Sequence, residues 1–153
     1  MEILYLLERI ESLPSFPQGT DIRWLAPEDY GVFIAHLALC GQNPLPREAW
    51  DRAYASGVRY CGLFAEETMA ARASVEPLSD RVWEVADART VQRLRGRGYA
   101  GRVCAFVARH ILGQGRLASI RTEEDNLPMR AVIARLGFRE IGPAEGFDPD
   151  AAG

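Results

Sequence analysis

The sequence predicts one α/β domain with a mixed, mostly antiparallel sheet and helices on both of its faces. Its 153 residues are 48% hydrophobic, which is enough for a core of its own. The hydrophobic pattern gives three strands in close order, then a helix, then a strand–helix–strand unit. That order is typical of a mixed sheet, because a strand that returns parallel to another needs a crossover helix.

Helical and extended patterns alternate in the N-terminal third of the chain. Apolar side chains near the start recur at helical spacing, at Ile3, Leu6, Leu7 and Ile10. They predict a short amphipathic helix over residues 2–12, which would pack against the core or in a homodimer. Residues 13–19 predict a linker. After it we expect a strand over 21–25 and helices over 27–39 and 47–56.

The later elements are predicted from apolar runs and from the turn signals between them. Strands are expected over 58–65, 68–75 and 81–90, followed by a helix over Tyr99–Gly113. A strand over 116–121, a helix capped by Asp125 or Asn126 that ends at Gly137, and a strand over 138–141 complete the pattern. The chain would then divide into an N-terminal helix and linker (1–19), a domain (20–142) and a flexible tail (143–153).

Charge is distributed unevenly along the chain. The formal net charge is −3, but residues 88–122 carry 8 arginines and no acidic side chain. A basic block inside an acidic protein favours a polyanionic ligand. A nucleic-acid-binding domain is expected to be basic as a whole, with a pI above ~9, whereas the sequence pI here is about 5.5. A small phosphorylated cofactor therefore fits better than DNA or RNA.

The segment from Thr90 to Gly101 contains the strongest functional signal. Gly96 and Gly98 stand among arginines, after an apolar run and before a helical pattern. Glycine lets the backbone turn tightly and expose its N–H groups. A following helix adds free N–H groups and the positive end of its dipole. Such an arrangement binds phosphate oxygens.

Two other phosphate-binding loops lack residues that they need. Gly96, Gly98 and Gly101 match the G-x-G-x-x-G dinucleotide motif. That motif also needs a βαβ unit with an acidic residue ~20 positions further on, and the region up to Thr122 contains no acid. A Walker loop needs a lysine, and the chain contains none.

Two motifs resemble those of the GCN5-related N-acetyltransferases, the GNAT superfamily. Residues 95–100, Arg-Gly-Arg-Gly-Tyr-Ala, look like its Arg/Gln-x-x-Gly-x-Gly/Ala signature. Residues 126–138 resemble its later Asn-x-x-Ala…Gly-Phe segment. The resemblance is good over 58–141 and loose over 20–57. It implies that two central parallel strands splay apart and that residues 20–142 form an acyl-CoA N-acyltransferase domain.

The resemblance also implies acetyl-CoA as co-substrate, bound between the splayed strands. Backbone N–H groups of residues 95–100 would bind its pyrophosphate, and Thr90 and Val91 would pair with its pantetheine amides. Asn126 would contact the cofactor, although capping of its helix is an equally good interpretation. The implied cofactor-binding residues are Thr90, Val91, Arg95, Gly96, Arg97, Gly98, Tyr99, Ala100 and Asn126. Any of Arg93, Arg97, Arg102 or Arg130 could reach the extra ribose phosphate.

Acyl transfer to an amine requires a proton acceptor, because an alkylammonium has a pKa near ~10.4. Glu84 matches the position of the glutamate base in histone-type members and is the candidate, with Asp87 as second choice. A solvent-facing strand residue is the other interpretation of Glu84. A strand N–H near Ala88 or Thr90 could stabilise the oxyanion.

The sequence departs from the family at the general acid. Many members place a tyrosine seven residues beyond the asparagine, where this chain has Ile133. The thiolate would then leave with a proton from solvent. The departure motivates an alternative function, a non-catalytic acyl-CoA-binding module that regulates a partner. Residues 27–56 would form the acceptor site, where carboxylates beside aromatics suit an amine.

Other classes of site and partner lack support in the sequence. His36 and His110 have no second ligand at metal-binding spacing, so no metal is expected. The 3 cysteines are odd in number and far apart, which favours the cytoplasm over a disulfide framework. No stretch approaches the ~18 apolar residues of a membrane span. The expected partner is a small-molecule or peptide amine, not a nucleic acid or a membrane.

Overall fold

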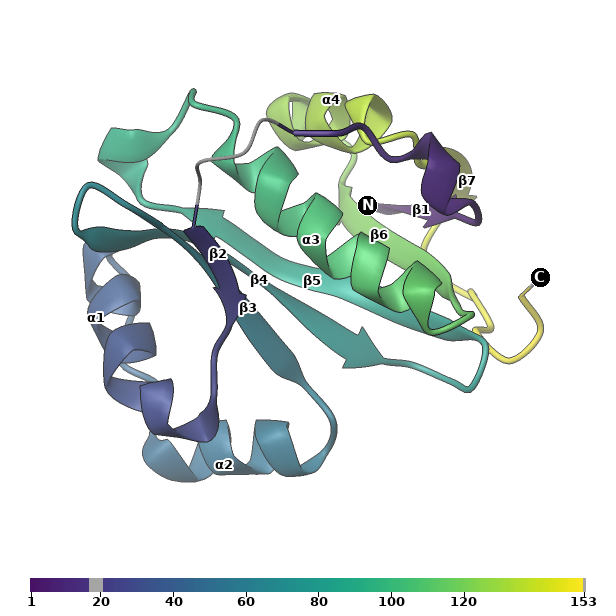
Figure 1. The fold of residues 1–153 in the computed structure, drawn as a ribbon. Helices are drawn as coiled ribbons and strands as arrows, with labels where there is room; N and C mark the ends of the chain where they lie inside the picture. Colours follow the sequence, from purple (N-terminus) through teal and green to yellow (C-terminus); the bar gives the residue numbers. More distant parts are fainter. Residues whose placement is uncertain (17–20, 153) are drawn as a thin grey trace.

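The computed structural model describes residues 1–16 and 21–152 and contains both strands and helices (Figure 1). The strands are β1 (Glu2–Leu7), β2 (Asp21–Trp24), β3 (Arg59–Ala65), β4 (Thr68–Pro77), β5 (Val82–Thr90), β6 (Leu117–Glu123) and β7 (Arg139–Pro143). The α-helices are α1 (Tyr30–Leu39), α2 (Arg47–Ala55), α3 (Tyr99–Gly113) and α4 (Leu127–Arg135). Single 3-10 turns occur at Ile10–Ser12, Pro27–Asp29 and Gln92–Leu94.

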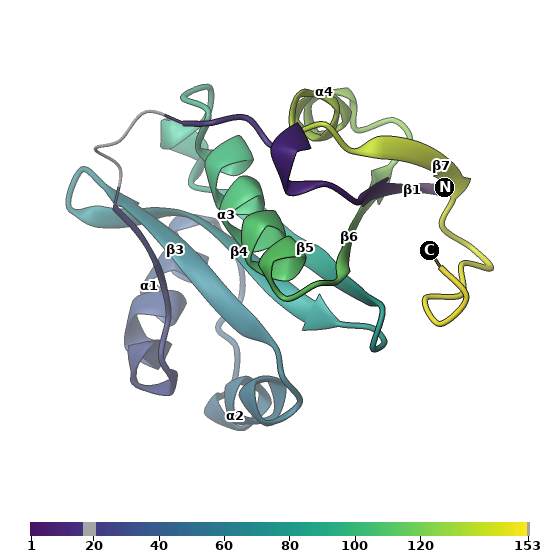
Figure 2. The same ribbon diagram turned by 45° about the vertical axis from the view of Figure 1, so that its right-hand side comes forward.

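The strands form one sheet in the order β2-β3-β4-β5-β6-β1-β7. Neighbouring strands are antiparallel except for the central pair β5 and β6, which is parallel. Figure 2 shows α3 and α4 on one side of the sheet and α1 and α2 on the other. The predicted fold class is confirmed, including the parallel pair at the centre of the sheet.

Each face of the sheet supports its own hydrophobic core, because side chains alternate between the faces along a strand. The larger core packs α3 and α4 against the sheet and includes Leu63, Val107 and Ile133. The smaller core is mainly aromatic and lies under α1 and α2, where Trp50 is fully buried among Phe33, Tyr54 and Tyr60.

The predicted helix over residues 2–12 is wrong, because the chain forms strand β1 there. Residues Ile3 to Leu7 are all buried, and β1 pairs with β6 on one side and β7 on the other. A strand buried on both faces is a continuous apolar run, and a run of this length also satisfies helical spacing. The apolar pattern of residues 2–12 is therefore compatible with both a helix and a buried strand.

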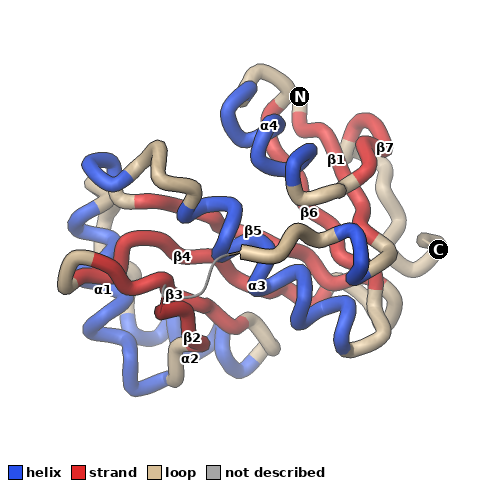
Figure 3. Tube along the Cα trace, turned by 45° about the horizontal axis from the view of Figure 1, so that its top comes forward, coloured by secondary structure: helices blue, strands red, loops and turns tan. Residues whose placement is uncertain are grey.

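The segment after β1 stays in contact with the domain. It passes through the turn at Ile10–Ser12, buries Leu13, and crosses α3 (Figure 3). The rest of the predicted linker, 17–19, lies outside the described residues. At the other end, Ala144 is buried and donates its N–H to the carbonyl of Glu2 over 2.9 Å. Flexibility beyond that point stays a prediction.

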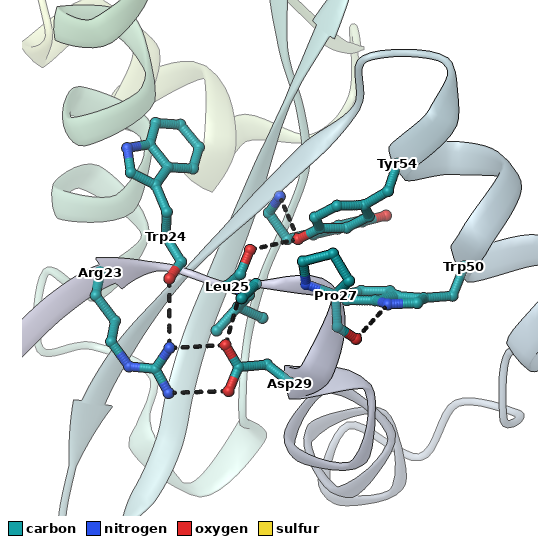
Figure 4. Close-up of polar contacts among 9 residues, drawn as sticks. Arg23, Trp24, Leu25, Pro27, Asp29, Trp50 and Tyr54 are labelled. Atoms are coloured by element: carbon teal, nitrogen blue, oxygen red, sulfur yellow. Dashed lines mark hydrogen bonds and ion pairs between the residues drawn. The ribbon is translucent and has the colours of Figure 1, made fainter.

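The connection from β2 to α1 is fixed by polar contacts (Figure 4). Arg23 pairs with Asp29 at 2.9 Å, and this contact lowers the pKa of the Asp29 carboxyl. The Tyr54 hydroxyl donates to the carbonyl of Leu25 over 2.8 Å, and the indole N–H of Trp50 donates to that of Pro27 over 3.0 Å. These bonds satisfy backbone carbonyls at the end of β2 and tie α2 to the start of α1.

Candidate functional site

The central feature of the site is the divergence of β5 and β6. The two strands pair at Val82↔Leu117, Trp83↔Ala118 and Glu84↔Ser119. Beyond that point β5 continues to Thr90 and β6 to Glu123 with no further pairing between their described residues. Main-chain N–H and C=O groups on the facing edges are left for another partner, because such groups are rarely buried without one. A ligand with amide groups can supply it.

A β-bulge interrupts β5 just beyond this point. Asp87 has a φ of 50°, and the register with β4 shifts between Ser74↔Ala86 and Arg72↔Arg89. Asp87 and Ala88 therefore have no partner residue in β4. A left-handed conformation costs a non-glycine residue about 1–2 kcal/mol, so other contacts must hold the bulge.

A buried arginine supplies those contacts. Arg72 is only 1% exposed, and its guanidinium binds both carboxylate oxygens of Asp87, at 2.9 and 3.3 Å. It also donates to Gln42 over 2.8 Å, while the Tyr60 hydroxyl donates to Asp87 over 2.8 Å. Burial raises the pKa of Tyr60 far above its usual range, with Asp87 adding to the effect, so Tyr60 stays a donor.

The glycine loop, residues 95–98, joins β5 to α3. Gly96 and Gly98 have φ values of 81° and 80°, which explains why glycine is needed at both. No backbone N–H between residues 96 and 101 donates to another backbone group of the described residues. The loop and the first turn of α3 thus present a row of free N–H groups at the positive end of the helix dipole, as an anion site requires.

A cleft of about 1020 Å³ connects these features. It extends from the end of β5, past the glycine loop and the first turn of α3, to α4. Most of the predicted cofactor residues line it, namely Thr90, Arg95, Gly96, Gly98, Tyr99, Ala100 and Asn126. The structure thus brings the two sequence motifs together on opposite walls of one cleft.

Val91 and Arg97, which were also predicted to bind the cofactor, do not line this cleft. The N–H of Val91 donates to Ala70 over 2.8 Å and its carbonyl accepts from Leu94 over 2.9 Å, so its main chain is already bonded within the protein. The Arg97 side chain is paired with Glu66 at 2.5 Å.

Asn126 both caps α4 and faces the cleft. Its side-chain oxygen accepts from the N–H of Met129 over 3.3 Å, which is the bond expected of an N-cap. Its amide nitrogen makes no hydrogen bond with the described residues and remains available as a donor. The two interpretations left open by the sequence are therefore compatible in one side chain.

The cations nearest the cleft differ from the four expected for the ribose phosphate. Arg93 and Arg97 share the carboxylate of Glu66, and Arg130 pairs with Glu140 at 2.7 Å. Arg102 lies 5.8 Å from the ring centroid of Phe16. The arginines that line the cleft are Arg89, Arg95 and Arg135. Sequence reasoning missed Arg89 and Arg135 because nothing in their spacing shows which way they face.

Glu84, the predicted base, occupies the last paired position before the strands diverge. It is 7% exposed, and one carboxylate oxygen accepts from Ser119 over 3.1 Å and from Arg121 over 2.9 Å. The described residues donate no hydrogen bond to its second oxygen. It does not line the cleft, since its neighbour Val85 packs into the larger core and alternation directs Glu84 to the opposite face.

Glu76 faces Glu84 across β4 and β5 and has no ion-pair partner among the described residues. Burial raises the pKa of its carboxyl, and the charges of Glu84 and Asp87 raise it further. The sequence held no usable signal for this contact, because a hairpin centred on the predicted turn at 77–80 would place position 76 opposite 81, whereas the observed register places it opposite Glu84.

Other candidate groups are unsuited to chemistry at the cleft. Ile133 is fully buried in the larger core and supplies no proton. Burial raises the pKa of Cys104 to about 12, so its thiol stays protonated. His36 is 1% exposed beside the Met69 carbonyl, and burial lowers its pKa. Within residues 1–16 and 21–152 there is no metal-binding group of three ligands, and no helix long and apolar enough to span a membrane.

Comparisons with known proteins agree with this geometry. The family model described as FR47-like protein matches residues 60–145, more than half of the chain. No curated protein matches the sequence significantly. Many solved structures share the fold, at sequence identities that show the fold alone.

Three of these structures illustrate the range. A GNAT-family protein from Novosphingobium aromaticivorans aligns over 92% of this chain and 59% of its own, with a TM-score of 0.72 and 21% identity. A tandem GNAT protein from the clavulanic acid biosynthesis pathway aligns over 92% of this chain and 50% of its own, with a TM-score of 0.67 and 19% identity. AAC(6′)-Iy in complex with the bisubstrate analogue CoA-S-monomethyl-acetylneamine aligns over 86% and 98%, with a TM-score of 0.68 and 16% identity. The chain thus spans about half to three fifths of the first two proteins.

Proposed function

Because the chain belongs to the FR47-like family of the GNAT superfamily, we propose that it is an N-acetyltransferase that uses acetyl-CoA. The acceptor would be an amine that attacks the thioester directly. One observation carries the proposal: the end of β5, where it no longer pairs with β6, lines the same cleft as the free N–H groups of the glycine loop. A thioester arm and a diphosphate are covalently linked in this cofactor and need both features together.

The protein groups that would bind the cofactor follow from the cleft. N–H groups of the glycine loop and of Tyr99 and Ala100 would donate to the pyrophosphate, supported by the α3 dipole. The free main-chain edge of β5 near Ala88 would pair with the pantetheine amides, as an added strand does. Asn126 would donate its amide from α4.

The bulge in β5 is the best candidate for stabilising the oxyanion. Ala88 has no partner residue in β4, and it lines the cleft, so its N–H could face a bound thioester. A preorganised N–H directed at a developing oxyanion lowers the barrier because it needs no rearrangement during the reaction. The bond between Arg72 and Asp87 would keep that N–H in position.

Proton transfer would take place on the opposite face of the sheet, where Glu76 and Glu84 face each other. The free oxygen of Glu84 can accept the ammonium proton, directly or through water. The departing thiolate would take a proton from solvent, since a thiol of this kind has a pKa near ~8.5 and Ile133 cannot donate.

The alternative is a non-catalytic acyl-CoA-binding module, favoured by the buried Ile133 where a tyrosine acid would stand. Release of free thiol from acetyl-CoA over a panel of amines separates the two functions. Amine-dependent release supports the transferase. Micromolar cofactor binding without release with any amine supports the module.

The site itself is tested by Gly98→Asp, with Gly98→Asn and Gly31→Asp as controls. The aspartate places a negative charge at the N-cap of α3 and should lower coenzyme A affinity more than a hundredfold by calorimetry. Asparagine has the same size and tolerates a positive φ, so it isolates the effect of charge. Gly31 is exposed on α1, and a Cβ there meets nothing within 4 Å. Wild-type affinity in Gly98→Asp would refute the loop assignment.

A further inference from the structure

An aromatic side chain from the N-terminal segment reaches the cleft. Phe16 and Pro14 line it, although they precede β2 and lie outside both sequence motifs. Just before them the segment passes close to the end of α4, where the Ser12 carbonyl oxygen lies only 2.7 Å from the place that a Cβ of Gly137 would take. Leu13 is buried in the larger core. Figure 1 shows this purple segment passing α4 and running above α3.

Phe16 packs close to a glycine in the first turn of α3. A Cβ on Gly101 would lie 3.9 Å from Cζ of Phe16 and 3.8 Å from Cγ1 of Val132. The ring therefore sits between the first turn of α3 and the middle of α4, next to the guanidinium of Arg102. It remains 38% exposed, and it lines the cleft rather than filling a closed core.

A cation lies on the side of the cleft that α4 forms. Arg135 is one turn beyond Val132 on α4, so the two side chains share a helix face. It is exposed, lines the cleft, and has no ion pair or hydrogen bond among the described residues. By contrast, Arg93, Arg97 and Arg130 each have a carboxylate partner.

These residues lie within reach of the glycine loop. Gly101 is three residues beyond Gly98, a rise of about 4.5 Å along a helix. A group attached directly to a phosphate on the loop therefore arrives beside Phe16. In coenzyme A that group is the adenosine, whose ribose carries the 3′-phosphate.

We propose that Phe16 and Arg135 form the nucleotide subsite of the cleft, with the Phe16 ring stacking on the adenine and Arg135 binding the 3′-phosphate. The inference rests on the proposed use of coenzyme A. An exposed aromatic face suits a purine because every base has a π-face to stack on. An arginine without a carboxylate partner suits a phosphate, whose geometry its planar guanidinium matches.

The test compares three ligands by calorimetry: coenzyme A, dephospho-coenzyme A, and 4′-phosphopantetheine, which lacks the adenosine. Phe16→Ala should weaken binding of the first two about tenfold and leave the third within a factor of about two. Phe16→Tyr keeps the ring and should bind all three normally. Arg135→Gln should weaken coenzyme A only. Ile10→Ala, in the same segment but outside the cleft, is the matched control.

Several results would overturn the proposal. Equal loss for all three ligands in Phe16→Ala would mean general damage to the cleft, and tighter binding would mean that Phe16 obstructs it. Equal loss of coenzyme A and dephospho-coenzyme A in Arg135→Gln would remove the phosphate contact. If wild-type protein binds no coenzyme A, the proposed function and the subsite both fail. If wild type binds and Phe16→Ala is unchanged, only the subsite fails.

Discussion

Among single residues, Glu84 combines a fixed position with one unoccupied oxygen. Glu84→Gln keeps the size and can still accept from Ser119, but it removes the charge and the proton acceptor. We expect turnover to fall about a hundredfold, the pH profile to flatten on its acidic limb, and coenzyme A affinity to stay within about twofold. Steady-state kinetics over pH would check this. An unchanged profile would remove Glu84 from the mechanism.

Ionisation of Glu76 lowers the stability of the folded protein. Its pKa is raised in the folded protein, so folding favours the protonated form. At pH below the unfolded pKa both states are protonated and nothing is lost. As pH rises through the folded pKa, the ionised carboxylate destabilises the native state. Glu76→Gln should therefore raise the melting temperature at pH 7 and have less effect at pH 4.

The control for Glu76→Gln is Glu145→Gln, which changes an exposed carboxylate in the segment after β7. Thermal unfolding of the three proteins at both pH values gives the comparison. If Glu76→Gln raises the melting temperature more at pH 4 than at pH 7, ionised Glu76 does not destabilise the folded protein.

Within β5, the bulge depends on an ion pair whose two ends are unequally buried. The Arg72 side chain is 2% exposed and that of Asp87 is 41% exposed. Removing the aspartate leaves a buried charge unpaired, which costs about 3–5 kcal/mol. Removing the arginine leaves a carboxylate that water can reach. Asp87→Ala should therefore destabilise the protein more than Arg72→Met does.

The double variant Arg72→Met with Asp87→Ala completes this cycle. It should be more stable than Asp87→Ala alone, because no buried charge remains. Denaturant unfolding measures all four proteins. A double variant less stable than both single variants would show that the pair acts mainly through something other than its charges.

The helices and strands with local signals could be predicted from the sequence. The expected helix over Tyr99–Gly113 has the bounds of α3, because a glycine precedes it and apolar residues repeat every turn. The tight turn at Gly96 and Gly98 could also be predicted, because glycine readily adopts the positive φ values found there. β1 could not be assigned, since its type depends on pairing with strands more than a hundred residues away.

The residues that line the cleft likewise fall into those with a local signal in the sequence and those without one. Those in the glycine loop belong to a continuous motif and could be located before the structure was known. Phe16, Arg89 and Arg135 come from three elements whose approach is set only by tertiary packing. The partners of Glu84 and Arg72 are also non-local, so burial and ion pairing at these positions had no signal in the sequence.

For the molecule as a whole, β1 is the strand that joins the edge of the sheet to its centre. Leu4 is fully buried on the face opposite α3. Leu4→Ala should cost about 2–5 kcal/mol of unfolding free energy, whereas Ile141→Ala, at a 43% exposed position of β7, should cost under about 1 kcal/mol. Equal losses in denaturant unfolding would mean that β1 contributes little to the assembled sheet.

The position of β1 also affects how the protein reaches its native state. Among the residues that the structure describes, β7 pairs with β1 alone, through contacts such as Tyr5↔Glu140. Contacts between residues this far apart in the sequence form slowly, and proteins dominated by such non-local contacts fold in milliseconds to seconds. During translation, β1 leaves the ribosome before β6 and β7, its two partners in the sheet, and must wait for both. The exposed apolar edge that it carries meanwhile is a natural target for chaperones.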